Sequence, residues 1–229
     1  MGGAVLAAQR ATSAIPIVAS AGDLVRDGLV ASLARPGGNI TGVTNVDADF
    51  SAKRLELLKD SFPKLSHVAV LSSEGMQGDQ DELTATRAAA RTLGVRIQSL
   101  EVKEPSQFQS VFSAMTKEHA EALIIANNAF TFFHRGQLFE LASKNRLPTM
   151  CGRAGFADAG GLMSYAADRL DSFRRAAVFV DKILKGRKPA DLPVEQPMKF
   201  EFIVNLKAAK PIGLTIPPNV LVRANEVIR

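Results

Sequence analysis

The stretch GLVASLARPGGNITGVTN, residues 28–45, contains an abrupt change of backbone preference. Small and apolar residues at helical spacing run up to RPGG, residues 35–38, and a β-branched segment, residues 40–44, follows. The residue before a proline is pushed out of the α region, and glycine adopts dihedral angles that other residues avoid. The pattern therefore predicts a helix over residues 25–34 that ends at the proline, after which the chain leaves in an extended segment.

On both sides of this stretch, short apolar runs alternate with helical patterns. The predicted strands are residues 15–19, 67–71, 95–102, 122–126, 147–151 and 161–165, and the predicted helices are residues 4–12, 51–61, 79–93, 106–117, 131–145 and 168–185. Residues 199–205 alternate with period two, which predicts an edge strand with one solvated face. The pattern of residues 205–229 predicts a short helix, a proline break at residues 216–218 and a last helix. This order is typical of βα units around a parallel sheet, so the predicted fold class is α/β.

The predicted strands are unevenly distributed along the chain. Only one convincing strand lies before residue 39, whereas about five lie between residues 66 and 165. A lone strand with two helices cannot cover its own faces. Residues 1–38 therefore either pack onto the larger unit or belong to a domain whose start is missing.

Composition limits the possible classes of protein. The chain has 229 residues, 46% of them hydrophobic, and only 6% aromatic with no tryptophan, which favours an aliphatic sheet covered by helices. The net charge of +5 is dispersed, without the basic cluster and recognition helix of a nucleic-acid-binding protein, so we expect no nucleic-acid partner. We find no apolar run long enough to span a bilayer and no signal peptide in this chain.

Motifs of enzyme chemistry are absent from the sequence. It has no Gly-x-Ser-x-Gly turn, no phosphate-binding loop and no cluster of ligands at metal spacing. The single Cys151 excludes an intramolecular disulfide and is better explained as a buried, inert thiol than as a nucleophile. We therefore predict no catalytic residue, no metal and no cofactor.

Polar residues follow the predicted strands. Ligands of open α/β sheets bind beyond the carboxyl ends of the strands, where loops and helix N-termini present unpaired amides. The predicted ligand-binding residues are Asp23, Ser72, Ser73, Asn127, Asn128, Phe130, Arg153 and Tyr165.

Each candidate also has an ordinary structural explanation. Asp23 caps the next helix, contacts a ligand, or does both. Ser72 and Ser73 are either loop hydroxyls or contacts. The two asparagines directly after the most apolar strand favour contact, and the guanidinium of Arg153 suits a ligand carboxylate.

The aromatic candidates are less specific. One of Phe130, Phe132 and Phe133 is expected to line the site, while the other two pack in the core. Tyr165 has either a hinge role or a cleft role.

The sequence resembles the ABC-transporter substrate-binding proteins of the tryptophan/tyrosine-binding type over essentially its whole length. The residues that carry the resemblance are 15–18 (IPIV), 22–23 (GD), 28–42 (GLVASLARPGGNITG), 159–165 (AGGLMSY), 174–177 (RRAA), 183–186 (ILKG), 188–197 (KPADLPVEQP) and 205–210 (NLKAAK). The resemblance implies a type I periplasmic-binding-protein fold, in which two doubly wound Rossmann-like lobes are joined by three crossing segments.

The resemblance also implies how this chain is divided. Lobe one would comprise residues 1–45 and 164–198, lobe two residues 46–163 and 199–205, and residues 206–229 a C-terminal helical tail. Members of the family begin with a signal or lipoprotein peptide and two further βα units, so lobe one is expected to be incomplete here. Residues 39–45, 161–165 and 197–204 would be the three crossings.

The function implied by the resemblance is solute binding for an ABC importer. The ligand would be a small organic molecule, such as an amino acid or an aromatic or carboxylated relative, captured between the lobes. The partner would be a membrane permease, and the location periplasmic or membrane-anchored outside the cytoplasm. A ligand-sensing module of a regulator with the same fold and an α/β enzyme are the alternatives.

Overall fold

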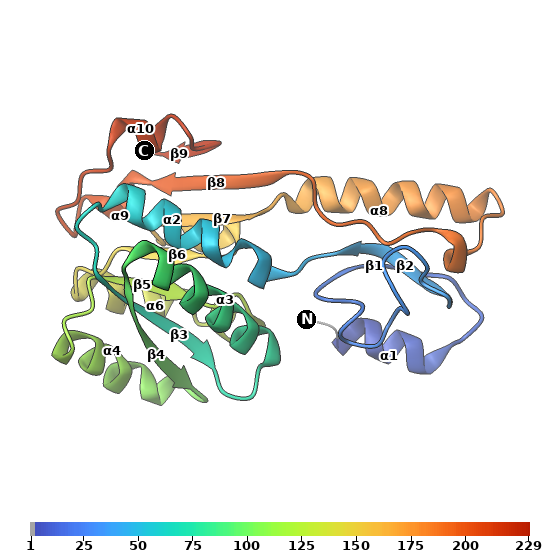
Figure 1. Ribbon diagram of the computed structural model, residues 1–229, viewed down its shortest axis with the longest axis horizontal. Coiled ribbons are helices and arrows are strands. Elements are labelled where there is room, and N and C mark those ends of the chain that lie inside the picture. The colour runs from blue at the N-terminus through green and yellow to red at the C-terminus, as the bar shows by residue number, and fades with distance from the viewer. Residues whose placement is uncertain (1–2) are drawn as a thin grey trace. The chain divides into compact units, whose positions relative to one another are not determined.

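The computed structural model describes residues 3–229 and divides the chain into two compact units (Figure 1). Unit 1 comprises the residues up to Val46 together with Ala167–Phe200, and unit 2 comprises Asp47–Ala166 and Glu201–Arg229. The chain therefore passes between the units at three places, after residues 46, 166 and 200. No helix in the described part of the chain is long and apolar enough to cross a membrane.

Unit 1 is built on two parallel strands. Strands β1 (Ile17–Ala21) and β2 (Ile40–Thr44) pair with Ile17 opposite Ile40. Helix α8 (Arg169–Leu184) lies along one side of this pair and helix α1 (Gly3–Ala11) along the other, as Figure 1 shows. The short helix η3 (Pro189–Asp191) precedes Glu195, which pairs with Val43 of β2. The small sheet is thus covered on both faces.

The helix predicted over residues 25–34 is wrong. One helical turn starts, because the amide of Asp27 donates to the carbonyl oxygen of Asp23 at 3.0 Å, but Gly28 then adopts a φ of 69°. The amides of Leu29 and Val30 both donate to the carbonyl oxygen of Leu24, which closes a compact loop in which Leu24, Leu29 and Val30 are buried. Apolar residues at helical spacing were therefore not sufficient to form a helix here, where a glycine with positive φ ends the first turn.

Unit 2 contains a seven-stranded sheet of order β4-β3-β5-β6-β7-β8-β9. The strands are β3 (His67–Ser73), β4 (Arg96–Val102), β5 (Ala122–Ile125), β6 (Thr149–Cys151), β7 (Met163–Ala167), β8 (Phe200–Asn205) and β9 (Glu226–Ile228). Strands β4 to β7 are parallel along this order. Their carboxyl ends therefore lie at one edge of the sheet.

Helices cover both faces of this sheet. They are η1 (Asp47–Phe50), α2 (Ser51–Ser61), α3 (Gln77–Leu93), η2 (Pro105–Gln107), α4 (Phe108–Lys117), α5 (Ala129–Phe133), α6 (Arg135–Lys144), α7 (Ala154–Ala157), α9 (Leu206–Ala209) and α10 (Pro218–Leu221). Val68 and Val70 of β3 belong to the core that α2 and α3 share, while Ala69 and Leu71 belong to the core of α4 and α6. Because successive side chains of a strand point to opposite faces, each buried strand contributes to both cores.

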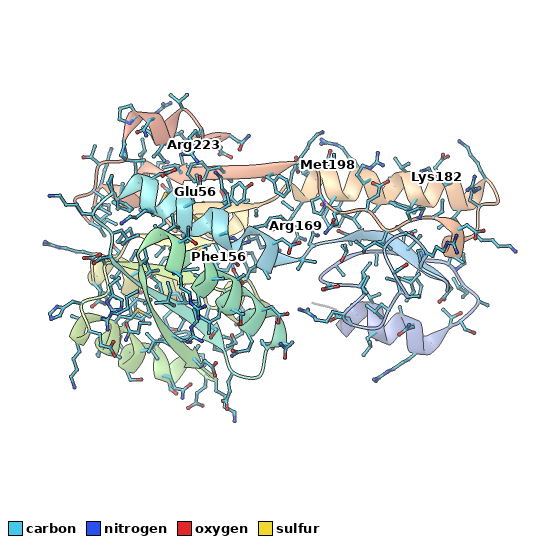
Figure 2. All side chains as sticks on the ribbon, viewed as in Figure 1. Glu56, Phe156, Arg169, Lys182, Met198 and Arg223 are labelled. Atoms are coloured by element: carbon cyan, nitrogen blue, oxygen red, sulfur yellow. The ribbon has the colours of Figure 1, made fainter. Side chains whose placement is uncertain are left out.

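Two predictions for the C-terminal part are also wrong. The strand predicted at 199–205 is not an edge strand, because β9 pairs with β8 on its outer side, and β9 forms within the residues predicted as a last helix. Phe202, Ile203 and Val204 are all buried, so β8 is covered on both faces. Arg223 fixes this tail to α2 through ion pairs with Asp60 and Glu56, the latter labelled in Figure 2.

Candidate functional site

Most of the predicted ligand-binding residues lie at the carboxyl edge of the unit 2 sheet. Ser72 and Ser73 end β3, Asn127 and Asn128 follow β5, and Arg153 follows β6. Phe130 lies in α5 and Tyr165 in β7, also in unit 2, whereas Asp23 follows β1 in unit 1. The parallel sheet thus brings residues from 72 to 165 to one edge.

A buried ionic cluster, which the sequence analysis missed, occupies this edge. Arg54 of α2 is fully buried, and its Nη2 donates to Oδ1 of Asp47 at 2.9 Å. Its Nη1 donates to a carboxylate oxygen of Glu82 on α3, and its Nε donates to the carbonyl oxygen of Tyr165 at 2.9 Å. Burying an unpaired charge would be too costly. Arg54 can be buried because two carboxylates and a carbonyl oxygen accept hydrogen bonds from its guanidinium.

The guanidinium of Arg54 needs a glycine beneath it. A Cβ atom on Gly152, the residue after β6, would lie 2.6 Å from Nη2 of Arg54. The backbone after β6 and the side chain from α2 therefore fit together only because position 152 has no side chain. The cluster consequently joins four parts of unit 2: the loop after β6, strand β7 and helices α2 and α3.

The protonation of this cluster is set by burial and by its opposite charges. Burial raises the pKa of Glu82 to about 7, against the attraction of Arg54, and the neighbouring Asp47 pushes it in the same direction as burial. Burial lowers the pKa of Arg54, but Glu82 and Asp47 outweigh it and the net direction is upward. Arg54 therefore stays charged, and Glu82 titrates near neutral pH.

A second buried cluster contains two residues of the predicted site, Ser73 and Asn128. The Nδ2 of Asn128 donates to Oγ of Ser73 at 2.9 Å and to Oδ2 of Asp79 at 2.6 Å, and its Oδ1 accepts from the amide of Thr131. Asp79 also accepts from the amide of Ser73, and burial raises its pKa. Ser72 is buried and donates to the carbonyl oxygen of Leu100 at 3.5 Å. Ser72, Ser73 and Asn128 are therefore positioned to hold the loops at the carboxyl edge of the unit 2 sheet.

Asn127 differs from its neighbour. Its Nδ2 donates to Oδ2 of Asp47 at 3.0 Å and its backbone amide donates to Glu82 at 3.4 Å. Its Oδ1 is buried and has no hydrogen-bond partner among the described residues. Asn127 therefore presents an unsatisfied acceptor at the carboxyl edge, next to the ionic cluster.

The aromatic candidates separate into packed and exposed rings. Phe130 is half-buried and packs against Phe108 and His134, with ring centroids 5.8 and 4.8 Å apart. Two guanidinium groups contact the ring of Phe132, that of Arg153 at 3.8 Å and that of Arg135 at 4.3 Å from its centroid. Phe133 has an exposed fraction of 79%. Phe133 is therefore the accessible aromatic ring of helix α5.

The remaining predicted residues have capping or backbone roles. Oδ1 of Asp23 accepts from the amides of Val25 and Arg26, at 3.2 and 3.0 Å, so it caps the single turn that begins there. Tyr165 is half-buried and its carbonyl oxygen receives the hydrogen bond from Arg54. Cys151 is buried, as predicted, and burial raises the pKa of its thiol. A buried, protonated thiol is a poor nucleophile.

A local signal for the missed residues exists in the helical spacing. Arg54 shares the buried face of α2 with Leu57, Leu58 and Ser61, so a charge occupies an apolar stripe. Asp79, Glu82 and Thr86 form a similar buried polar stripe on α3. Long charged residues on a buried face are almost always paired, which would have predicted an ionic contact but not its partner.

Other features of the molecule lie away from this edge. A hollow of about 660 Å³ in unit 2 is lined by residues of α6, α9 and β9 and by none of the predicted ligand-binding residues. Within the residues that the structure describes, no group of three or more potential ligands is placed to hold a metal ion.

The comparisons with known proteins agree with this architecture. The sequence profile of the ABC transporter substrate binding proteins matches residues 1–228. The chain belongs to this family. A curated relative, a tyrosine-binding protein of Clostridioides difficile strain R20291, is 24% identical over 210 residues, which are 91% of this chain and 60% of the relative. This substrate-binding protein thus spans about 60% of that relative's length.

Solved structures share its fold. An ABC domain from Streptococcus pneumonia, in complex with L-Trp, is 26% identical, with a TM-score of 0.84 over 96% of this chain and 74% of that chain. A conserved domain protein from Vibrio cholerae has a TM-score of 0.86 at 24% identity over the same shares of the two chains. The predicted α/β fold of the type I periplasmic-binding-protein kind is confirmed.

Proposed function

We propose that this chain is the solute-binding part of an ABC importer and that its ligand is an aromatic amino acid. Membership of the substrate-binding family supports the solute-binding role. The similar structure that contains L-Trp and the curated relative named for tyrosine binding support the class of ligand. In this proposal unit 1 is lobe one, unit 2 is lobe two, and the ligand is captured in a cleft between the lobes, which close by bending of the crossing segments.

The observation that carries the proposal is the chemistry of the carboxyl edge of unit 2. Asn127 offers a buried acceptor without a partner, which suits an ammonium or amide donor of a ligand. Arg153, on the loop after the neighbouring strand, offers a guanidinium for a carboxylate, and Phe133 offers an exposed ring. The buried Ser72, Ser73 and Asn128 would hold the loops that carry these contacts.

The role of the chain is binding rather than catalysis, and its further partners follow from the family. The closed, ligand-loaded form would dock on a membrane permease outside the cytoplasm. No nucleic-acid partner belongs to this proposal, because the charges along the chain are dispersed. Closure over the ligand would exclude water and so strengthen each polar contact.

Isothermal titration calorimetry of this chain with L-tryptophan and L-tyrosine tests the proposal. Arg153→Met should weaken binding about tenfold or more, as expected when a charged hydrogen bond is lost. Arg91→Met, which changes an exposed cation of the same unit, is the matched control and should leave affinity unchanged. The absence of both heat and thermal shift with every L-amino acid tried would exclude the proposal.

A further inference from the structure

We infer that Arg54 is a positioning residue that anchors two of the three connections between the units to the sheet of unit 2. The first connection enters unit 2 at Asp47, and the second leaves it after Ala166. One buried side chain bonds residues at both places. The consequence for ligand affinity rests on the proposed function, whereas the anchoring itself does not.

The contacts of Arg54 act on the path of the chain. At the first connection, Arg54 donates to Oδ1 of Asp47 at 2.9 Å and to its carbonyl oxygen at 3.4 Å. At the second, its Nε donates to the carbonyl oxygen of Tyr165 at 2.9 Å. Two of these three acceptors are backbone carbonyls, so the guanidinium fixes the main chain as well as a side chain. The planar fork of an arginine reaches such divergent acceptors, whereas an ammonium group does not.

Burial makes this anchor stiff. Arg54 is fully buried, so any displacement from Glu82, Asp47 and Tyr165 would leave a charge without partners inside the protein. Gly152 sets the floor of the space, since a Cβ atom there would overlap the guanidinium. In the proposed closure, the bending would therefore lie on the unit 1 side of Asp47 and Tyr165.

The same carboxylates also orient Asn127. Oδ2 of Asp47 accepts from the side-chain amide of Asn127, and Glu82 accepts from its backbone amide. This arrangement leaves Oδ1 of Asn127 as the group without a partner among the described residues. Arg54 thus joins the two connections to a predicted ligand contact without touching the ligand.

Hydrogen–deuterium exchange with mass spectrometry on the full chain tests the anchor. Arg54→Lys keeps the charge but loses the fork, and Gly152→Ala displaces the guanidinium while leaving position 54 unchanged. Lys53→Met is the matched control, because Lys53 lies on the same helix and pairs only with the half-buried Glu56 among the described residues.

Both test variants should increase exchange at peptides that contain residues 44–49 and 163–168 by about tenfold or more. Peptides of β3 and β4 should keep the exchange rates of the wild type, as should all peptides of the Lys53→Met control. Unchanged exchange at either connection, or a uniform loss of protection throughout unit 2, would overturn the inference, because the second result describes a general loss of stability.

Affinity for L-tryptophan or L-tyrosine, measured on the same variants, provides a separate result. If the wild type binds, Arg54→Lys should weaken binding by about tenfold while the melting temperature stays well above the assay temperature. Wild-type affinity in a variant with loosened connections would overturn the link to Asn127. If the wild type binds neither amino acid, the proposed function fails, and the exchange result alone decides on the anchor.

Discussion

The side-chain amide of Asn128 lies 2.9 Å from Oγ of Ser73 and thereby joins the loop after β5 to the end of β3. The same Nδ2 reaches Asp79, and Oδ1 caps α5, so every polar atom of Asn128 has a partner inside unit 2. Two residues that lie 55 positions apart in the sequence thus form one buried network. Networks of this kind are costly to break, because the remaining groups stay buried without partners.

Asn128→Ala should destabilise the protein by about 2–4 kcal/mol, because Ser73, Asp79 and the start of α5 each lose a hydrogen bond. Urea unfolding followed by circular dichroism measures this change. Gln109→Ala, an exposed glutamine on α4, is the control and should change the free energy of unfolding by less than about 0.5 kcal/mol. Equal effects of the two substitutions would show that the network does not stabilise the fold.

The raised pKa of Glu82 predicts a pH dependence of stability. Because its pKa is about 7 in the folded protein and near 4.5 in the unfolded chain, the folded state binds more protons between these values. Stability contributed by this group is therefore present at low pH and lost as pH rises through the window. Asp79, whose pKa is also raised, acts in the same direction, so the difference between variants is the quantity to measure.

Glu82→Gln imitates the protonated carboxyl and isolates the effect of this one group. The loss in free energy of unfolding that Glu82→Gln causes, relative to the wild type, should be a few kcal/mol smaller at pH 8 than at pH 5. Urea denaturation at the two pH values gives both free energies of unfolding. A penalty that grows with pH would mean that the ion pair with Arg54 outweighs burial and that the pKa of Glu82 is not raised.

The backbone conformation at position 28 is expected to require a glycine. Its φ of 69° disfavours a side chain although no atom would contact an added Cβ, so Gly28→Ala should destabilise by about 1 kcal/mol. Gly38→Ala, at a glycine with open space and without positive φ, should be nearly neutral. Thermal unfolding followed by circular dichroism compares the two. A gain in stability and helicity for Gly28→Ala would indicate that residues 25–34 do form the helix.

Cys151 should react with a thiol reagent only when the protein opens. The thiol is buried at the end of β6 and burial raises its pKa, so both access and thiolate formation are suppressed. Ellman's reagent should label the native protein at least about a thousandfold more slowly than the urea-unfolded chain. Rapid labelling without denaturant would show that this end of β6 opens locally.

The local pattern was sufficient for the regular elements of unit 2. Strands at residues 67–71 and 122–126 and the helix at residues 51–61 were predicted within two residues of their ends, because apolar runs and helical spacing respond directly to burial. The same pattern failed at residues 25–34, where the amides of Leu29 and Val30 donate to the carbonyl oxygen of Leu24 and close a loop instead of a helix. It also failed at β9, whose pairing with β8 depends on a neighbouring strand rather than on its own residues.

The sequence by itself determined the α/β class, the family and the polar residues that follow the strands, because these depend on residue types and on spacing along the chain. Only the tertiary structure decided that Arg54, Glu82 and the residues at two chain connections meet around one guanidinium. Such a meeting depends on the order of strands and on the exact packing of two helices against the sheet. A buried charge reveals in the sequence that it needs partners, but the partners are selected by contacts between segments up to 111 residues apart.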